Sequence, residues 1–92
     1  MTKIDKDKIK VFLTQNSDWK VFGSKTIKRE FMLDSFKEAI RFVNKVAELA
    51  EKMDHHPDIL IKYKKVKLTL TTHSAGGLSE KDFSLAKKIN KL

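Results

Sequence analysis

The residues best suited to chemistry in this 92-residue chain are its three histidines, which all lie between His55 and His73. Two of them are adjacent, and the third ends a strand-like run that would fold back toward the first two. Glu51 lies one helical turn before His55, and Asp54 directly precedes it. Asp82 opens the next predicted helix, which must follow His73 closely, so Asp82 is a candidate partner for that imidazole. The spacing therefore predicts a cluster of three imidazoles and up to three carboxylates.

Acid–base catalysis is the chemistry that this cluster favours. Imidazole titrates near pH ~6.5 and can both donate and accept protons at neutral pH. Adjacent histidines point in different directions, whereas zinc prefers pairs at helical or strand spacing, and the chain has no cysteine. The chain also lacks a Gly-x-Ser-x-Gly elbow and a glycine-rich phosphate loop. We therefore predict metal-free proton transfer rather than a zinc site or nucleophilic hydrolysis.

Each member of the cluster also has a purely structural interpretation. His55 near a helix C-terminus gains stabilisation from the helix dipole when it is charged. Asp82 lies three residues after Ser79, the spacing of a capping box, and it can cap a helix and hold a histidine at once. Glu51 alone would be a solvated helix acid. For single residues these interpretations are favoured, but the convergence of three histidines from separate elements favours a functional site.

Three helices and two pairs of strands are predicted around the cluster. Pro57 ends the long helix near Asp54, because the residue before proline avoids the helical region. The Lys64-Lys65 link is expected to form a tight turn. Two hairpins with helices predict an α+β domain, order α-ββ-α-ββ-α, over residues 1–92. The expected helices cover 5–16, 35–53 and 79–89, and the expected strands cover 19–22, 26–33, 59–63 and 66–72.

The helix predicted over 35–53 has an apolar arc of nearly half its circumference. This arc is wider than the ~100° that a helix needs to cover one sheet. We expect a second subunit to cover the excess in a homodimer or homotetramer. The residues expected at that contact are Phe42, Val46 or Leu49.

The net charge of +8 comes mainly from lysines, which occur in every segment. Only Arg29 and Arg41 could make bidentate base contacts, so no specific nucleic-acid partner is expected. The pattern favours a solvated lysine coat over a polyanion site, although charge would still favour an anionic small molecule or a weak, salt-sensitive polyanion contact. No apolar run reaches the length of a membrane span, and the first residues lack a signal-peptide core, so we expect a cytoplasmic protein without membrane contact.

In the spacing of its functional residues, the chain resembles the pterin-4a-carbinolamine dehydratase family. Further likeness lies in the Thr71-Thr72-His73 run and in the segment from Gly77 to Asp82. The likeness is most specific between residues 51 and 89. The residues that carry the signature are Glu51, His55, His56, Pro57, Tyr63, His73 and Asp82.

The resemblance implies a four-stranded antiparallel sheet with helices on one side, assembled as dimers or tetramers. It implies a hydro-lyase, 4a-hydroxytetrahydrobiopterin dehydratase, which converts the pterin-4a-carbinolamine to quinonoid dihydropterin in tetrahydrobiopterin recycling. The pterin is the substrate, and no cofactor or metal is implied. Some animal members also act as a dimerisation cofactor for a transcription factor. A non-catalytic protein-binding or regulatory module on the same fold is therefore the alternative.

The resemblance also assigns roles to individual positions. It implies that His55, His56 and His73 are catalytic, and that the same three histidines bind the pterin together with Asp54, Thr71 and Thr72. It gives supporting roles to Glu51, Pro57 and Asp82. The chain departs from the family at Ser74, where members often carry an acid, which puts the charge environment of His73 in doubt.

Overall fold

The structure, a computed structural model, describes residues 3–92 and has the predicted α-ββ-α-ββ-α order. A short 3-10 helix, His73–Ala75, follows the last strand. None of the helices within residues 3–92 is both long enough and apolar enough to span a membrane. The helices are α1 (Lys6–Gln15), α2 (Phe36–Met53) and α3 (Glu80–Ile89), and the strands are β1 (Lys20–Phe22), β2 (Thr26–Met32), β3 (Asp58–Lys62) and β4 (Lys65–Leu70).

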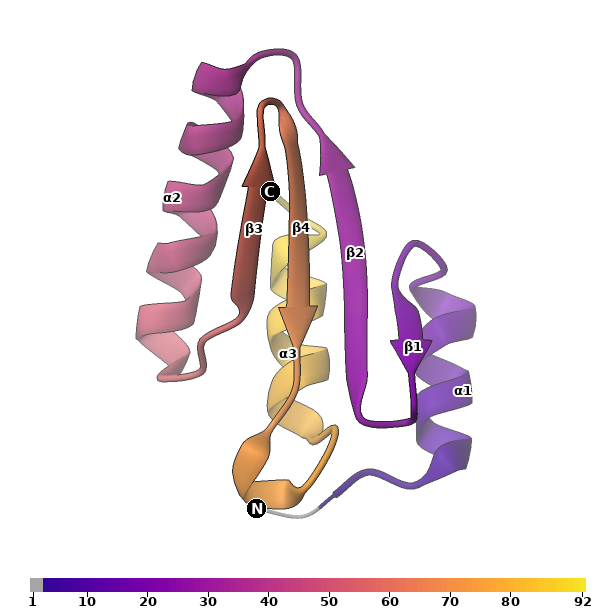
Figure 1. Ribbon diagram of the computed structural model, residues 1–92. Helices are drawn as coiled ribbons and strands as arrows, with labels where there is room; N and C mark the ends of the chain where they lie inside the picture. Colours follow the sequence, from indigo (N-terminus) through magenta and orange to yellow (C-terminus); the bar gives the residue numbers. More distant parts are fainter. Residues whose placement is uncertain (1–2) are drawn as a thin grey trace.

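The four strands form one antiparallel sheet in the order β1-β2-β4-β3. Both predicted hairpins are present, and β2 pairs with β4 to join them. In Figure 1, α3 passes behind β4, while α2 and α1 flank the β3 and β1 ends of the sheet. The fully buried residues of β2 and β4 face the helices, and they are Ile27, Val66, Leu68 and Leu70. The opposite face of the sheet is left open.

The turn between β3 and β4 lies one residue earlier than the sequence predicts. Tyr63 and Lys64 form the turn, whereas Lys65 already pairs with Lys62 in the sheet. Tyr63 has φ 55°, in the left-handed region that non-glycine residues avoid. The register of the sheet therefore imposes this turn on residues with little intrinsic preference for it.

The end of α2 places the two adjacent histidines. Asp54 is left-handed (φ 50°, ψ 44°), and its backbone N–H donates to the carbonyls of Ala50 and Glu51. The next backbone N–H, that of His55, donates to the Ala50 carbonyl at 3.0 Å. This pattern is a Schellman motif, which reverses the chain direction at a helix end. The reversal at Asp54, together with Pro57, sends the chain away from the helix axis and into β3.

The apolar arc of α2 is mostly covered within the chain itself. Val46 is fully buried in the core, so of the three residues expected at a subunit contact this one is already covered by the chain itself. Phe42 packs on Phe31 with ring centroids 4.6 Å apart, and Leu49 is also partly buried against the core. The large apolar side chain that α2 leaves exposed is Phe36. The sheet and α3 together cover more of the helix than its sequence pattern suggested.

Candidate functional site

All three histidines line one open pocket of about 330 Å³ at the end of the sheet where α2 and β4 finish. His55 and His56 follow the end of α2, and His73 begins the 3-10 helix after β4. The three imidazoles therefore reach the pocket from two segments that are distant in the sequence, and the predicted cluster is present. The complete lining is Asp54, His55, His56, Thr71, Thr72, His73, Ser74 and Lys81.

His55 is held by a buried carboxylate. Its Nε2 lies 2.6 Å from Asp82 Oδ1, and the two side chains are 10% and 0% exposed. An ionised carboxylate can only accept hydrogen bonds, so Nε2 carries the proton and donates it to Asp82. In the neutral ring Nδ1 is then unprotonated. His55 is thus fixed in orientation and tautomer, with Nδ1 as the ring nitrogen available to a ligand.

Asp82 itself is fixed by the start of α3. Its Oδ2 accepts from the Thr72 hydroxyl at 2.8 Å and from the Ser79 backbone N–H at 2.9 Å. Because Thr72 donates to Asp82, the Thr72 oxygen accepts from the Ser79 hydroxyl at 2.8 Å. Ser79 and Asp82 also form the predicted capping box of α3. One carboxylate therefore begins the helix and holds the imidazole.

His56 is held much more loosely. Its Nε2 lies 2.5 Å from Glu51 Oε2, but the two side chains are 56% and 75% exposed. Ion pairs exposed to this degree contribute about 0–1 kcal/mol. Glu51 therefore restrains His56 without enclosing it, and the imidazole of His56 remains exposed to water.

His73 is exposed, and its imidazole has no hydrogen-bond partner within residues 3–92. The backbone around it is fixed, because Thr72 and Gly77 form an isolated antiparallel bridge across the 3-10 helix. Thr71 donates its hydroxyl to the Lys25 carbonyl at 2.7 Å, which ties this segment to the β1–β2 turn. A loop tied by these contacts thus presents an exposed imidazole to the pocket.

The partners of the histidines differ from the expected ones. The sequence suggested Asp82 for His73, yet Asp82 holds His55, because the reversal at Asp54 turns His55 toward the first turn of α3. Glu51 precedes His55 by one turn but contacts His56. Chain proximity was a poor guide here because α2 ends and α3 begins at the pocket.

Three residues have a place at or beside the site that the sequence did not predict. Lys81 lines the pocket and brings a positive charge to it; its position beside Asp82 was the only signal. Ser74, noted as a departure from the family, also lines the pocket. Ser79 was noted only as a helix cap. The supporting residues Glu51, Pro57 and Asp82 are not part of the pocket lining, although Glu51 and Asp82 each contact a histidine that is.

Two further properties describe the chemistry that the site offers. Within residues 3–92, no group of three or more histidine, aspartate and glutamate side chains is arranged to hold a metal ion. No buried side-chain nitrogen or oxygen in the same range lacks a hydrogen-bond partner. The arrangement offers one fixed imidazole, two exposed imidazoles, hydroxyl groups and charges of both signs around one pocket.

Comparison with known proteins identifies the family. A family model described as pterin 4 alpha carbinolamine dehydratase matches residues 2–92. The chain belongs to this family. A Sulfolobus acidocaldarius protein provisionally named as a pterin-4-alpha-carbinolamine dehydratase is 46% identical over 90 residues, with 98% of each chain covered. A Chloroflexus aggregans protein with the same provisional name is 47% identical over 92 residues, covering 100% of this chain and 98% of the relative.

Solved structures agree with the pterin carbinolamine dehydratase fold. A Brucella melitensis protein described as a transcriptional coactivator/pterin dehydratase superposes with a TM-score of 0.92 at 34% identity, covering 98% of this chain and 97% of its own. A pterin dehydratase-like protein described as a RuBisCO assembly factor of the alpha-carboxysome gives a TM-score of 0.69 at 21% identity, over 80% of this chain and 87% of its own. The second likeness concerns the fold alone.

Proposed function

We propose that this protein catalyses the dehydration of a 4a-hydroxytetrahydropterin to the quinonoid dihydropterin by histidine acid–base chemistry. The observation that carries the proposal is the convergence of three imidazoles on one pocket in a member of this family. We assign catalysis to His55, His56 and His73. The physiological substrate in this proposal is the tetrahydrobiopterin carbinolamine. It forms when the reduced pterin is oxidised, and its dehydration is a step in regenerating the reduced pterin.

The reaction needs two proton transfers and no redox change. The C4a–O bond breaks, and the departing hydroxyl takes a proton from an acid so that it leaves as water. A ring N–H gives its proton to a base, and its electron pair forms the new C=N bond. One water is lost for each pterin, and before the next turnover the base releases its proton to water while the acid regains one. Positioned proton transfer of this kind contributes ~10²–10⁴-fold to a rate.

We propose His55 as the base. Its Nε2–H is committed to Asp82, which leaves Nδ1 as the nitrogen that would accept the proton, and the carboxylate would stabilise the imidazolium formed by that transfer. His56 and His73 are exposed and unenclosed, which suits an acid that must protonate the leaving hydroxyl and then regain a proton from water. Asp54, Thr71 and Thr72 are assigned to pterin binding, because all three line the same pocket.

The test is to follow carbinolamine dehydration by absorbance with and without the purified protein. Acceleration that is lost in His55→Ala, and reduced in His56→Ala and His73→Ala, is the expected result. Full activity in all three single variants would contradict the assignment. Activity should also survive a strong chelator, because no metal takes part, and complete loss on chelation would overturn the proposed chemistry.

A protein-binding role on the same fold is the second candidate. The Brucella melitensis relative, 34% identical, is described as a transcriptional coactivator as well as a pterin dehydratase, which supports weighing this role here. A pure scaffold has no need of a buried carboxylate that fixes one imidazole at a pocket. A purified protein that leaves the dehydration rate unchanged would favour the scaffold over the enzyme.

A further inference from the structure

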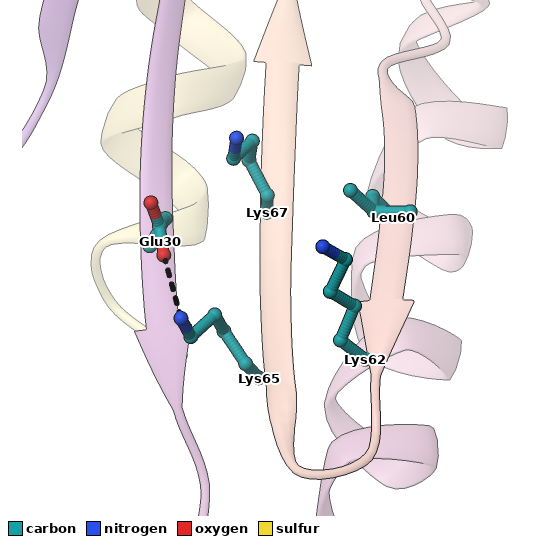
Figure 2. A pocket seen from close by; sticks show the side chains of 5 residues that line it. All are labelled: Glu30, Leu60, Lys62, Lys65 and Lys67. Carbon is teal, nitrogen blue, oxygen red and sulfur yellow. Dashed lines mark ion pairs between the residues drawn. The ribbon is translucent and has the colours of Figure 1, made fainter.

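Five lysines gather on the open face of the sheet, although the sequence distributes them over four strands. They alternate with inward residues such as Val21, Val66 and Ile61, so they project away from the helices. In Figure 2 the helices lie behind the strands while the lysines extend in front. We call this surface the lysine face; its members are Lys20, Lys28, Lys62, Lys65 and Lys67.

The lysine face places like charges directly opposite one another. Lys20 pairs with Lys28 between β1 and β2, and Lys62 pairs with Lys65 between β3 and β4. Directly opposed side chains have Cβ atoms about 5 Å apart, and like charges there destabilise a sheet. Two such pairs on one face are a cost to folding that an anion on the face would relieve.

Two acidic residues near the lysine face are already engaged, whereas a third, Asp58, lies exposed at the far end of β3 opposite Thr69 and has no ion-pair partner within residues 3–92. Glu30 lies 3.5 Å from Lys65, and Asp18 lies 3.4 Å from Arg29. Figure 2 shows the Glu30–Lys65 pair, with Lys62 and Lys67 outside it. Within residues 3–92, the members of the lysine face with no carboxylate in ion-pair range are Lys20, Lys28, Lys62 and Lys67.

Apolar side chains lie between these ammonium groups. Phe22 is 50% exposed, and the Lys28 ammonium sits 4.7 Å from its ring centroid. Leu60 is exposed beside Lys67. Two shallow depressions, of about 90 and 360 Å³, cover the face and share Glu30 and Lys67 in their linings. Neither shares a residue with the histidine pocket.

We propose that the lysine face binds single-stranded nucleic acid without sequence preference. Lysine ammonium groups act as point charges for phosphate oxygens. The arginine that borders the face, Arg29, is already held by Asp18 and Asn90, so its guanidinium is not free to read base edges. The open aromatic ring and neighbouring apolar groups offer stacking surfaces for unpaired bases. This combination of a basic track and a stacking ring distinguishes single strands from duplexes and from acidic peptides, in which no base can stack.

Fluorescence anisotropy with a labelled oligothymidylate of about 20 nucleotides tests the proposal. For four phosphates neutralised, the slope of log K against log salt should be about −3. Lys20→Gln combined with Lys67→Gln should raise Kd about tenfold or more and make the slope less steep by about 1.4. Phe22→Ala should raise Kd about fivefold or more with the slope unchanged.

The matched control is Lys37→Gln combined with Lys45→Gln, two exposed lysines of α2. It removes the same charge and should leave Kd within about twofold. If this control lost as much affinity for oligothymidylate as the Lys20→Gln and Lys67→Gln double variant, the proposal would be overturned in favour of a general lysine coat. Binding of poly-glutamate or duplex DNA as tightly as oligothymidylate, with no effect of Phe22→Ala, would overturn it as well. Circular dichroism and urea unfolding of each variant show whether weaker binding comes from unfolding or from the loss of contacts to the oligonucleotide.

Discussion

Asp82→Asn is the substitution that best separates the two roles of the buried carboxylate. Asp82 accepts three hydrogen bonds, one on Oδ1 from His55 and two on Oδ2 from Thr72 and Ser79. The asparagine amide can keep its oxygen toward Thr72 and the Ser79 N–H, which preserves the helix cap. Its NH₂ then faces His55 Nε2. The reverse orientation would set this NH₂ against the Ser79 N–H and lose the cap.

The preferred orientation changes the tautomer of His55. An amide NH₂ donates, so Nε2 must become the acceptor and the ring proton moves to Nδ1. The nitrogen that we propose as the base is then already protonated. Turnover should fall about 100-fold or more, within the range that positioned proton transfer contributes. The nitrogen-15 chemical shifts of the His55 ring should exchange between its two nitrogens.

The stability cost of Asp82→Asn should leave the protein folded. All three hydrogen bonds to this side chain change from charge-assisted to neutral, which lowers the free energy of unfolding by about 3 kcal/mol. Domains of this kind typically have ~5–15 kcal/mol, so the variant should remain folded. Urea unfolding measures the loss, and absorbance assays of dehydration measure the turnover.

Asp5→Asn is the matched control. Asp5 caps α1 through a hydrogen bond from the Lys8 backbone N–H at 3.0 Å and lies outside the histidine pocket. Asparagine caps about as well as aspartate, so stability and turnover should both stay near those of the unmodified protein. If Asp82→Asn kept at least half of the turnover while its ring shifts stayed unchanged, the tautomer argument would be refuted.

The remaining predictions concern the other imidazoles, the turn and the assembly. His55→Ala should cost about 2–4 kcal/mol in urea unfolding because it leaves Asp82 buried without its partner, whereas His56→Ala should cost at most about 1 kcal/mol; equal costs would show that burial does not distinguish the two pairs. Tyr63→Gly should raise the free energy of unfolding by about 0.5–1 kcal/mol because it relieves a left-handed φ; a lower urea midpoint would mean that the exposed ring contributes more than the backbone strain. Light scattering should find a dimer or tetramer that Phe36→Ser weakens, since α2 leaves this apolar ring exposed; a monodisperse monomer at tens of micromolar would contradict this prediction.

The sequence alone determined the order of elements and the location of the chemistry. Pro57 and the apolar periodicity fixed where α2 ends, because proline and helical amphipathicity act over a few neighbouring residues. The two hairpins followed from alternation in the strands. The sequence predicted that the three histidines lie together, because a hairpin returns the chain to its starting point. The pocket is lined by His55, His56 and His73.

Only the tertiary structure decided which groups meet across elements. Asp82 holds His55 rather than His73, because the left-handed turn at Asp54 aims His55 at the start of α3. Val46 disappears into the core because α3 and the sheet both pack on α2, a property that one helix pattern cannot reveal. The lysines that are dispersed along the chain become one charged face because antiparallel register brings four strands side by side. Helix, strand and turn propensities depend on neighbouring residues, whereas pairing between side chains distant in the sequence depends on how the helices and strands pack.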